Sequence, residues 1–229
     1  MDTIEFKKIK QNDPYYVDVL ALRYKVYCDE RGFEHPDDHS DGLEMDHYDP
    51  HSIHFAAILK HTQQVVGTVR LILYSGQGFP VENSFELTND HANLQREHMG
   101  ELSRLALSRS NRDRLQDKSH VRLKFKRSQV LNGLFHCVAK ECVELGISHL
   151  YAAMAKGLFV LLAREKITFL QIGPEKEYHG LRAPYLGTVK DIISQNPLLL
   201  RGYDEREENS DLSSEVCTIE EVFRLRHTR

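Results

Sequence analysis

The spacing of apolar residues predicts a helix near the start of the chain. Asp13-Pro14 is typical of a helix beginning, because the aspartate can cap the helix and the proline fits its first turn. Three- and four-residue steps then connect one helical face, formed by Tyr16, Leu20, Arg23 and Tyr27. Gly32 is expected to end the helix. An arginine therefore lies on a face that is otherwise typical of a core.

Longer apolar runs predict a sheet. Residues 53–59 and 65–73, joined by the polar turn 60–64, predict an antiparallel hairpin, and residues 101–107 predict a further strand. The second half of the chain predicts a helix over 130–145 that ends at Gly146, a strand over 149–154, a helix over 155–166 and a strand over 167–172. We therefore expect an α/β (α+β) fold, in which helices cover a mixed sheet, and not a helical bundle or a β-sandwich.

Composition favours a single globular core. With 229 residues and 41% hydrophobic content, the chain is large enough for one sizeable core. No run reaches the roughly 18 apolar residues of a membrane span, and the first residues lack an export signal. We expect a cytoplasmic protein without an integral membrane segment. Its cysteines are expected to be reduced thiols, since their spacing matches no metal motif: Cys28, Cys137, Cys142 and Cys217.

Two charges interrupt the predicted strand 101–107. Glu101 and Arg104 lie in an otherwise apolar run, and burying an ion costs several kcal/mol unless it is paired or used. Side chains alternate along a regular strand, so residues three apart face opposite sides. A β-bulge would place both charges on one face, and bulges are frequent beside active sites. We expect a bulge at this position.

Other charged residues are candidate partners for Glu101 and Arg104. Arg23 lies on the first helix, Arg70 interrupts the strand 65–73, and an acidic group lies between them, formed by Glu44, Asp46 and Asp49. Together they indicate one polar site enclosed by a hydrophobic fold. A structural ion-pair network is the competing interpretation for Arg23, Arg70 and the aspartates.

The charged residues resemble those of the acyl-homoserine-lactone (autoinducer) synthases, which are acyltransferases of the GNAT fold. The matching positions are Arg23, Phe33, Asp46, Asp49, Arg70, Phe85, Glu101 and Arg104. The sequence is still more similar to a sister branch, the exosortase-associated (PEP-CTERM system) acyltransferases and long-chain N-acyl amino acid synthases. That resemblance rests on Tyr27-Cys28, Gly32-Phe33-Glu34, residues 101–106 and residues 173–185. It implies a GNAT-like domain over residues 1–202 with a mostly antiparallel sheet, followed by an acidic tail over 203–229.

The resemblance implies that a fatty acyl group moves from a carrier-protein thioester to an amine and forms an amide. Glu101 would be the general base, because an ammonium must lose a proton before it attacks. Arg104 and Arg70 would complete the catalytic group by holding the acceptor or orienting Glu101. The expected substrate-binding residues are Arg23, Phe33, Asp46, Asp49, Phe85, Ser103, Met154, His179 and Arg182. No bound cofactor or metal is expected.

The donor is expected to be acyl-phosphopantetheine on an acyl carrier protein and not acyl-coenzyme A. After the strand 101–107, the usual coenzyme A loop of GNAT enzymes contains glycines, whereas residues 108–114 contain none. A basic segment follows that could dock an acidic carrier protein, through Arg109, Arg112, Arg114, Arg122, Lys124 and Lys126. Edge-strand protection is an equally strong explanation for residues 121–126. A nucleic acid is not expected as a partner, since no binding motif accompanies these charges.

Three other functions remain open at this stage. An acetyl-coenzyme A-dependent GNAT enzyme would share the fold. A catalytically silent acyl-lipid-binding protein would share an apolar slot for the acyl chain. A metal-binding module would use a polar segment that is rich in histidine and aspartate, with His35, Asp37, Asp38, His39, Asp41, Asp46, His47, Asp49, His51 and His54. In the acidic tail, residues 219–225 have a helical pattern that could dock on the domain.

Overall fold

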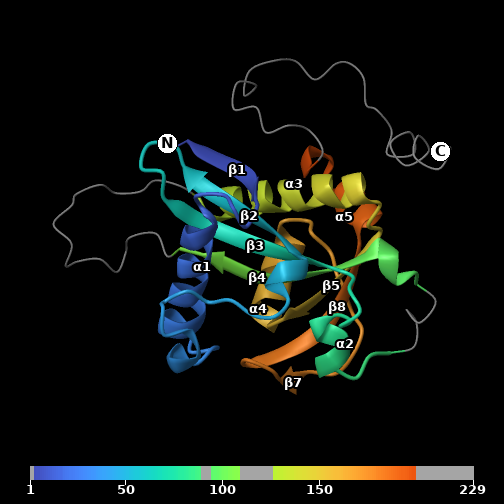
Figure 1. Ribbon diagram of the computed structural model, residues 1–229. Helices are drawn as coiled ribbons and strands as arrows, with labels where there is room; N and C mark the ends of the chain where they lie inside the picture. Colours follow the sequence, from blue (N-terminus) through green and yellow to red (C-terminus); the bar gives the residue numbers. More distant parts are fainter. Residues whose placement is uncertain (1–2, 89–93, 109–125, 200–229) are drawn as a thin grey trace, which may run out of the picture.

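The computed structural model describes residues 3–88, 94–108 and 126–199. These residues form an eight-stranded sheet in the order β1-β2-β3-β4-β5-β8-β6, with β7 also paired to β8 (Figure 1). The strands are β1 (Ile4–Ile9), β2 (Ser52–Leu59), β3 (Val65–Leu73), β4 (Met99–Leu107), β5 (His149–Met154), β6 (Leu170–Gln171), β7 (Lys176–Glu177) and β8 (Leu181–Thr188). Only β4 and β5 pair in parallel, so the expected mixed, mostly antiparallel sheet is confirmed.

Helices cover both faces of this sheet (Figure 1). The α-helices are α1 (Tyr16–Tyr24), α2 (Pro80–Ser84), α3 (Arg127–Leu145), α4 (Lys156–Arg164) and α5 (Val189–Gln195). A π-helical turn, Lys25–Glu30, continues α1, and short 3-10 turns occur at Pro36–His39, Asp49–His51, Arg96–His98 and Pro197–Leu199. Side chains of α3, α4 and α5 pack on one face, and those of α1 and α2 contribute to two smaller clusters on the other.

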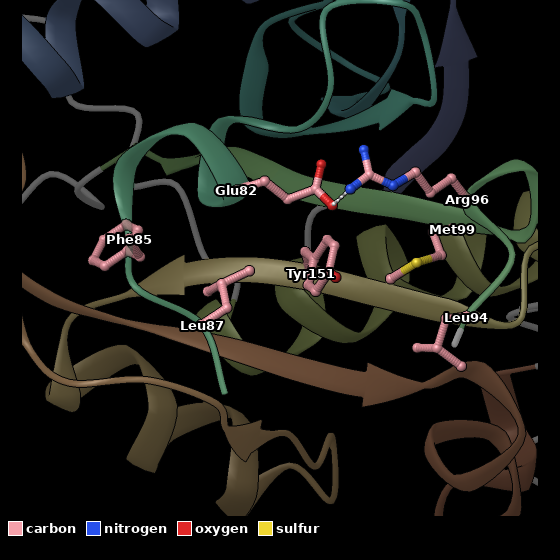
Figure 2. Close-up of a pocket in the computed structure, with 7 residues that line it drawn as sticks. All are labelled: Glu82, Phe85, Leu87, Leu94, Arg96, Met99 and Tyr151. Carbon is pink, nitrogen blue, oxygen red and sulfur yellow. Dashed lines mark ion pairs between the residues drawn. The ribbon is translucent and has the colours of Figure 1, made fainter. Parts of the chain in front are cut away.

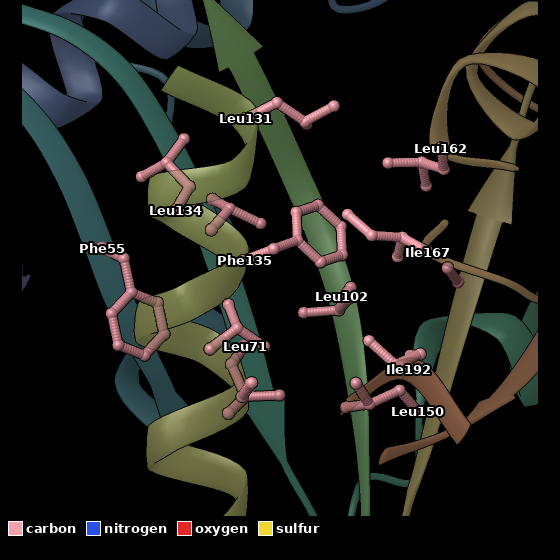
Figure 3. Close-up of a cluster of buried hydrophobic side chains, with 14 of the residues drawn as sticks. Phe55, Leu71, Leu102, Leu131, Leu134, Phe135, Leu150, Leu162, Ile167 and Ile192 are labelled. Carbon is pink, nitrogen blue, oxygen red and sulfur yellow. The ribbon is translucent and has the colours of Figure 1, made fainter. Parts of the chain in front are cut away.

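The larger core lies under α3. Leu131, Leu134 and Phe135 of this helix meet strand residues such as Leu71 and Leu102, and all five side chains are buried (Figure 3). The sheet face opposite is more polar, because α1 contributes Arg23 to it alongside its apolar residues. The fold therefore keeps one face for a dry core and uses the other for the charged site.

A β-bulge in β4 is confirmed where the sequence predicts it. Arg70 pairs with Ser103 and Thr68 pairs with Ala106, so two residues of β4 oppose one residue of β3. The first of these two residues, Arg104, has φ +50°, in the left-handed region that favours glycine. The bulge directs Arg104 toward Glu44, while Ser103 beside it accepts a hydrogen bond from Arg70, which binds Asp46. A regular strand would have turned them to opposite faces.

The parallel pairing of β4 with β5 is short. It runs from Met99–His149 to Leu102–Ala152. Beyond these residues β4 continues against β3, and β5 continues against β8. Within the described part of the chain, the edge of β4 after Leu102 therefore has no ladder partner on the β5 side.

Most predicted elements are confirmed, and the errors fall at both ends of the domain. The strands β1 and β8 were not predicted, and the predicted strand 167–172 is reduced to Leu170–Gln171. No strand was predicted after residue 172, but Tyr185 is 2% exposed and lies in β8. The helix after Asp13-Pro14 begins only at Tyr16, and it widens into the π-helical turn before Gly32.

Two predictions lie outside the described residues: the acidic tail 203–229, with its helical pattern, and most of the basic segment after residue 108. The division of the chain at residue 202 thus stays a prediction. Among the described helices, none combines the length and the hydropathy needed to cross a bilayer.

We expect Gly67→Ala to destabilise the fold, because a Cβ at this position would lie 2.5 Å from Cγ1 of Val130 in α3. Overpacking of this kind costs about 1–3 kcal/mol. The matched control is Gly157→Ala in α4, where a Cβ has no neighbour within 4 Å and helix propensity improves. Urea unfolding should show a loss for Gly67→Ala and no loss for Gly157→Ala. Equal stabilities would mean that α3 does not pack tightly on β3.

Candidate active site

The candidate site begins with a fully buried arginine on α1. Arg23 is 0% exposed, and its Nε donates to Oε2 of Glu44 at 2.6 Å. Its Nη1 and Nη2 donate to the two oxygens of Asp49 at 2.7 and 3.2 Å. Glu44 and Asp49 are also 0% exposed. A buried charge that loses its partner is strongly destabilising, so this group fixes the segment after α1 against the sheet.

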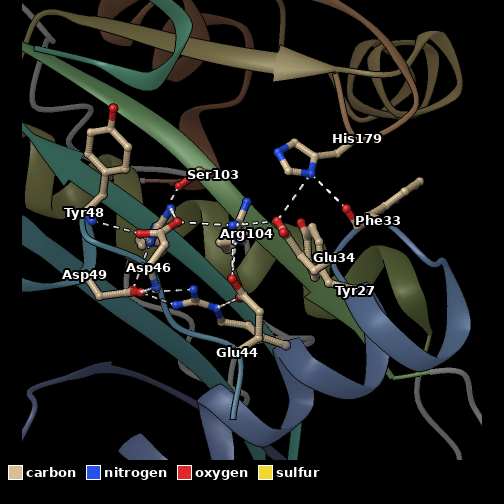
Figure 4. A network of polar contacts seen from close by, with 12 residues as sticks. Tyr27, Phe33, Glu34, Glu44, Asp46, Tyr48, Asp49, Ser103, Arg104 and His179 are labelled. Atoms are coloured by element: carbon tan, nitrogen blue, oxygen red, sulfur yellow. Dashed lines mark hydrogen bonds and ion pairs between the residues drawn. The ribbon is translucent and has the colours of Figure 1, made fainter. Parts of the chain in front are cut away.

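Two arginines from the sheet extend this group into a network (Figure 4). Arg70 on β3 donates to both oxygens of Asp46, at 2.6 and 2.9 Å, and its Nη1 lies 2.9 Å from Oδ1 of Asp49. Its Nε donates to Oγ of Ser103 at 2.9 Å. Arg104 on the bulge reaches three acids, with Nε 3.0 Å from Oε1 of Glu44 and Nη2 2.8 and 3.1 Å from Glu34 and Asp46. The ion pairs therefore connect α1, β3 and β4.

The acidic segment is held by its own backbone as well. Asp46 N–H donates to Oδ2 of Asp49 at 2.7 Å, and Tyr48 N–H donates to Oδ1 of Asp46 at 2.9 Å. Arg23 binds Asp49, whereas Asp46 pairs with Arg70 and Arg104. Burial alone would raise the pKa of Asp49, yet the Arg23 guanidinium holds it well below its usual range. The pKa values of Glu44 and Asp46 are lowered in the same way, by Arg23 and Arg70 respectively.

Glu101 lies apart from these ion pairs and has a different environment. It is 2% exposed, and its Oε2 accepts a hydrogen bond of 2.9 Å from the backbone N–H of Val81 in α2. Burial raises the pKa of Glu101 to about 8, against the lowering effects of the Val81 N–H and of Arg70. Its strand neighbours across the ladder are Ile72 on β3 and Tyr151 on β5. A carboxyl group with this pKa can take and release a proton near neutral pH.

A group of rings, Tyr27, Phe33, Tyr178 and His179, lies beside Arg104. The π-helical turn lets Tyr27 C=O accept from Phe33 N–H at 2.7 Å, which places Phe33 and Glu34 beside β4. His179 Nδ1 lies 2.8 Å from the Phe33 carbonyl oxygen (Figure 4). Burial raises the pKa of Tyr178, and Glu101, Arg104 and Arg182 all act on its phenol. The turn before β8 therefore faces the same site as the bulge in β4.

A cavity of about 300 Å³ lies next to Tyr151, the ladder neighbour of Glu101 on β5. Its lining consists of Glu82, Phe85, Leu87, Leu94, Arg96, Met99 and Tyr151 (Figure 2). Met99 and Tyr151 come from the two strands whose parallel pairing contains Glu101. The charged members of the lining pair with each other, since Arg96 Nη2 lies 3.1 Å from Oε1 of Glu82. The ring of Phe85 packs edge-on against Tyr178.

The structure separates the predicted residues into groups. Around the bulge and its network lie Arg23, Phe33, Asp46, Asp49, Arg70, Ser103, Arg104, His179 and Arg182. Phe85 lines the cavity, whereas Met154 is 3% exposed and belongs to the large core. Of the docking residues, Lys126 is exposed at the start of α3, and the others lie outside the described residues.

Some groups of the site could not be predicted from the sequence. Glu34 had no separate signal, because an acid in a polar loop is common. The Val81 N–H is a backbone group and has no sequence signature. No group of three or more histidine, cysteine or acidic side chains among the described residues could hold a metal ion. The structure thus lends no support to the metal-binding alternative.

Comparison with known proteins identifies a family pattern and relatives that are similar to this chain. The sequence pattern of the family described as "Acetyltransferase (GNAT) domain" matches residues 22–122, which include the bulge and its network. An acyl-homoserine-lactone synthase of Aliivibrio fischeri (strain ATCC 700601 / ES114) is 26% identical over 184 residues, covering 80% of this chain and 86% of that protein.

Two solved structures show the same fold. BjaI, a CoA-dependent acyl-homoserine lactone synthase solved with SAM and isopentyl-CoA, superposes with a TM-score of 0.64 at 18% identity, covering 97% of this chain and 98% of that one. FeeM, an N-acyl amino acid synthase from uncultured soil microbes, superposes with a TM-score of 0.59 at 15% identity, covering 85% of this chain and 94% of that one.

We expect Asp49→Asn to lower the free energy of unfolding by about 3–5 kcal/mol, since it removes the charge that Arg23 and Arg70 share. The folded pKa of Asp49 is lowered, so its contribution is present above the ordinary carboxylate pKa of about 4. It is lost as the pH falls through the lower folded value. Urea unfolding at several pH values should therefore show a steep acid loss in the wild type and a shallower one in the variant.

The control for this prediction is Asp38→Asn, an exposed aspartate of the same loop. It should leave both the stability at neutral pH and the acid loss unchanged. If Asp49→Asn behaved like this control, the buried ion pairs would contribute nothing net to folding.

Proposed function

We propose an amide-forming reaction for this chain, which is a GNAT-domain acyltransferase homologous to the acyl-homoserine-lactone synthases. In this reaction a fatty acyl group leaves an acyl carrier protein thioester and is transferred to the amine of an amino acid or a related small molecule. The carbonyl carbon forms a bond with the amine nitrogen, and its bond to the thiol sulfur breaks. The amine loses a proton and the thiol leaves.

The observation that carries this proposal is the environment of Glu101. A thioester is already activated, so the enzyme must chiefly place the amine, remove its proton and stabilise the oxyanion. Glu101 is buried beside the cavity, and its pKa of about 8 suits a general base that works near neutral pH. The Val81 N–H holds one carboxyl oxygen in place. A pure lipid-binding protein would have no use for such a group.

We place the thioester where β4 and β5 diverge. Their pairing ends at Leu102 and Ala152, one residue after Glu101. In the described chain, β4 has no ladder partner on the β5 side beyond this point, so backbone N–H groups there can bind an extended pantetheine arm and donate to an oxyanion, while the Leu105 carbonyl oxygen accepts from the Tyr27 hydroxyl. The reacting carbonyl would then lie next to the carboxyl group that accepts the proton.

The arginines of the network act in this proposal as positioning residues. Arg104 holds a left-handed backbone conformation, which costs a non-glycine residue about 1–2 kcal/mol. Its ion pairs to Glu34, Glu44 and Asp46 stabilise that conformation, and Arg70 holds the Ser103 hydroxyl beside it. Because these guanidinium groups are already paired, they shape the bulge and do not serve as the main anchors for substrate.

The identities of the donor and the acceptor are supported by the sequence and by the relatives of this chain. A glycine-free stretch and a basic segment in residues 108–127 favour an acyl carrier protein over free coenzyme A. FeeM is an N-acyl amino acid synthase of the same fold, which supports an amino acid as the acceptor. The relative from Aliivibrio fischeri is an acyl-homoserine-lactone synthase, so that activity is the second candidate.

Product identification tests this proposal directly. Purified enzyme is incubated with long-chain acyl carrier protein or with the matching acyl-coenzyme A, and with pooled amino acids or S-adenosylmethionine. Mass spectrometry should detect an N-acyl amino acid from the carrier-protein donor. An N-acyl-homoserine lactone made only from S-adenosylmethionine would favour the second candidate. The absence of any acylated amine with either donor would overturn both.

Glu101→Gln should reduce the turnover of the acylation reaction by about 10²–10⁴-fold, the usual contribution of a general base. In the wild type, kcat/KM should rise with pH and level off above about pH 8, because the base must be unprotonated. Stopped-flow or continuous thiol detection at several pH values measures both effects. The control is Glu97→Gln, an exposed glutamate two residues before β4. A variant with wild-type turnover would show that Glu101 is structural.

In this proposal the acyl chain lies in the cavity, so the size of the cavity limits the length of the chain. Leu87 lines the cavity and is only partly buried, so Leu87→Trp should fill part of the 300 Å³ without disturbing the large core. We expect kcat/KM to fall for long acyl donors and to be retained for short ones, measured over a series of donor lengths. The control is Val160→Trp, at an exposed position of α4. An unchanged length profile would assign the acyl chain to another part of the protein.

A further inference from the structure

A second glutamate, on α2, lies next to the group that binds Glu101. Glu82 directly follows Val81, whose N–H donates to Oε2 of Glu101 at 2.9 Å. The Oε2 of Glu82 accepts from the backbone N–H of Phe79 at 3.1 Å, as the acid at the third helical position does in a capping box. Phe79 has no side-chain oxygen that could cap α2 itself. Glu82 therefore fixes the first turn of α2, and with it the N–H that binds Glu101.

The other oxygen of Glu82 is bound by an arginine from outside the helix. Arg96 lies on the 3-10 turn before β4, and its Nη2 is 3.1 Å from Oε1 of Glu82 (Figure 2). The side chain of Glu82 is 15% exposed and that of Arg96 is 53% exposed, so a half-exposed guanidinium balances a carboxylate that is largely withdrawn from water. Both side chains line the cavity with Tyr151, the ladder neighbour of Glu101. The ion pair is therefore connected to Glu101 in two ways, through Val81 along the chain and through Tyr151 across the sheet.

Charges from several elements act on the Glu101 carboxyl group. Burial raises its pKa, and the carboxylate of Glu82 acts in the same direction, because it disfavours a second negative charge nearby. The Val81 N–H, Arg70 and Arg104 oppose this effect, and each of the two arginines is itself bound by acids of the network. The charge of Glu101 also acts on two phenols, from β5 and from the turn before β8: Tyr151 and Tyr178. A change in the charge of Glu82 is therefore expected to alter the protonation of Glu101.

We propose that Glu82 and Arg96 are positioning residues that together control the protonation of Glu101. This inference rests on the proposed function, in which Glu101 is the base. Glu82 has two effects: its cap holds the Val81 N–H on the Glu101 carboxyl group, and its charge favours the protonated form of Glu101. Arg96 opposes that charge and leaves the cap in place. Removal of one or the other partner of this ion pair should therefore shift the protonation of Glu101 in opposite directions.

The test uses Glu82→Gln, which removes the charge and keeps the cap, because an amide oxygen still accepts from the Phe79 N–H. The rise of kcat/KM with pH should move to lower pH by at least about half a pH unit, since a neighbouring negative charge is lost. Arg96→Met should move the rise to higher pH, and in both variants the rate at high pH should change little. Glu82→Ala removes the cap as well, so it should lower the rate at high pH by about tenfold or more.

The controls are Glu97→Gln and Arg164→Met, which remove charges from exposed side chains and should leave the pH profile in place. Unfolding curves check that every variant is folded. Identical profiles of the wild type, Glu82→Gln and Arg96→Met would overturn the inference. A shift of both variants in the same direction would overturn it too, since that would indicate a general disturbance of the site.

A measurement without turnover separates this inference from the proposed function. NMR of enzyme with isotope-labelled glutamate carboxyl carbons follows each carboxyl group during a pH titration, and Glu101→Gln identifies the signal of Glu101 by its loss. The midpoint of this signal should fall in Glu82→Gln and rise in Arg96→Met. Such shifts in an enzyme that acylates no amine would support the inference while the proposed function fails. An amide product together with an unchanged midpoint in both variants would overturn the inference alone.

Discussion

The buried pairing of Arg23 with Glu44 and Asp49 is the interaction on which the site depends. These three side chains are withdrawn from water, and each would be strongly destabilising without its partners. They hold the segment after α1 against the sheet, and the same carboxylates bind Arg70 and Arg104. The shape of β4 is therefore coupled to the position of a loop that is distant in sequence.

This coupling places two different charge environments side by side. In the network, each carboxylate meets at least one guanidinium, and the pKa values of Glu44, Asp46 and Asp49 are lowered. Glu101 receives only a backbone N–H, and burial raises its pKa. The bulge thus separates acids that remain charged from one acid that can exchange a proton. The β4–β5 pairing ends one residue after that acid, and the cavity is lined by Tyr151, its ladder neighbour on β5.

The sequence predicts this arrangement in part, and the reasons differ from residue to residue. The bulge was predictable, because Glu101 and Arg104 in one apolar strand cannot share a face without it. The edge strand β1 was missed because it contains Lys7 and Lys8 and therefore lacks a continuous apolar pattern.

The strand β8 was missed because Pro184 argues against a strand. Pro184 is tolerated because it lies between the residues of β8 that pair with β6 and those that pair with β7. The positions of Arg182 and Tyr185 in a strand could therefore not be predicted. The contact between Val81 and Glu101 could not be predicted at all, since any residue supplies the same N–H.

The separation of the network partners along the chain has a consequence for folding. The ion pairs of the network join residues 21 to 70 positions apart, and they require α1, the loop, β3 and β4 to be in place together. Contacts of this kind repay the entropy of loop closure only late in assembly. An early compact intermediate would therefore expose unpaired arginines and carboxylates. The site could catalyse its reaction only when these elements have reached their native arrangement. Proteases or chaperones that recognise incompletely folded molecules would therefore act on them before any catalysis begins.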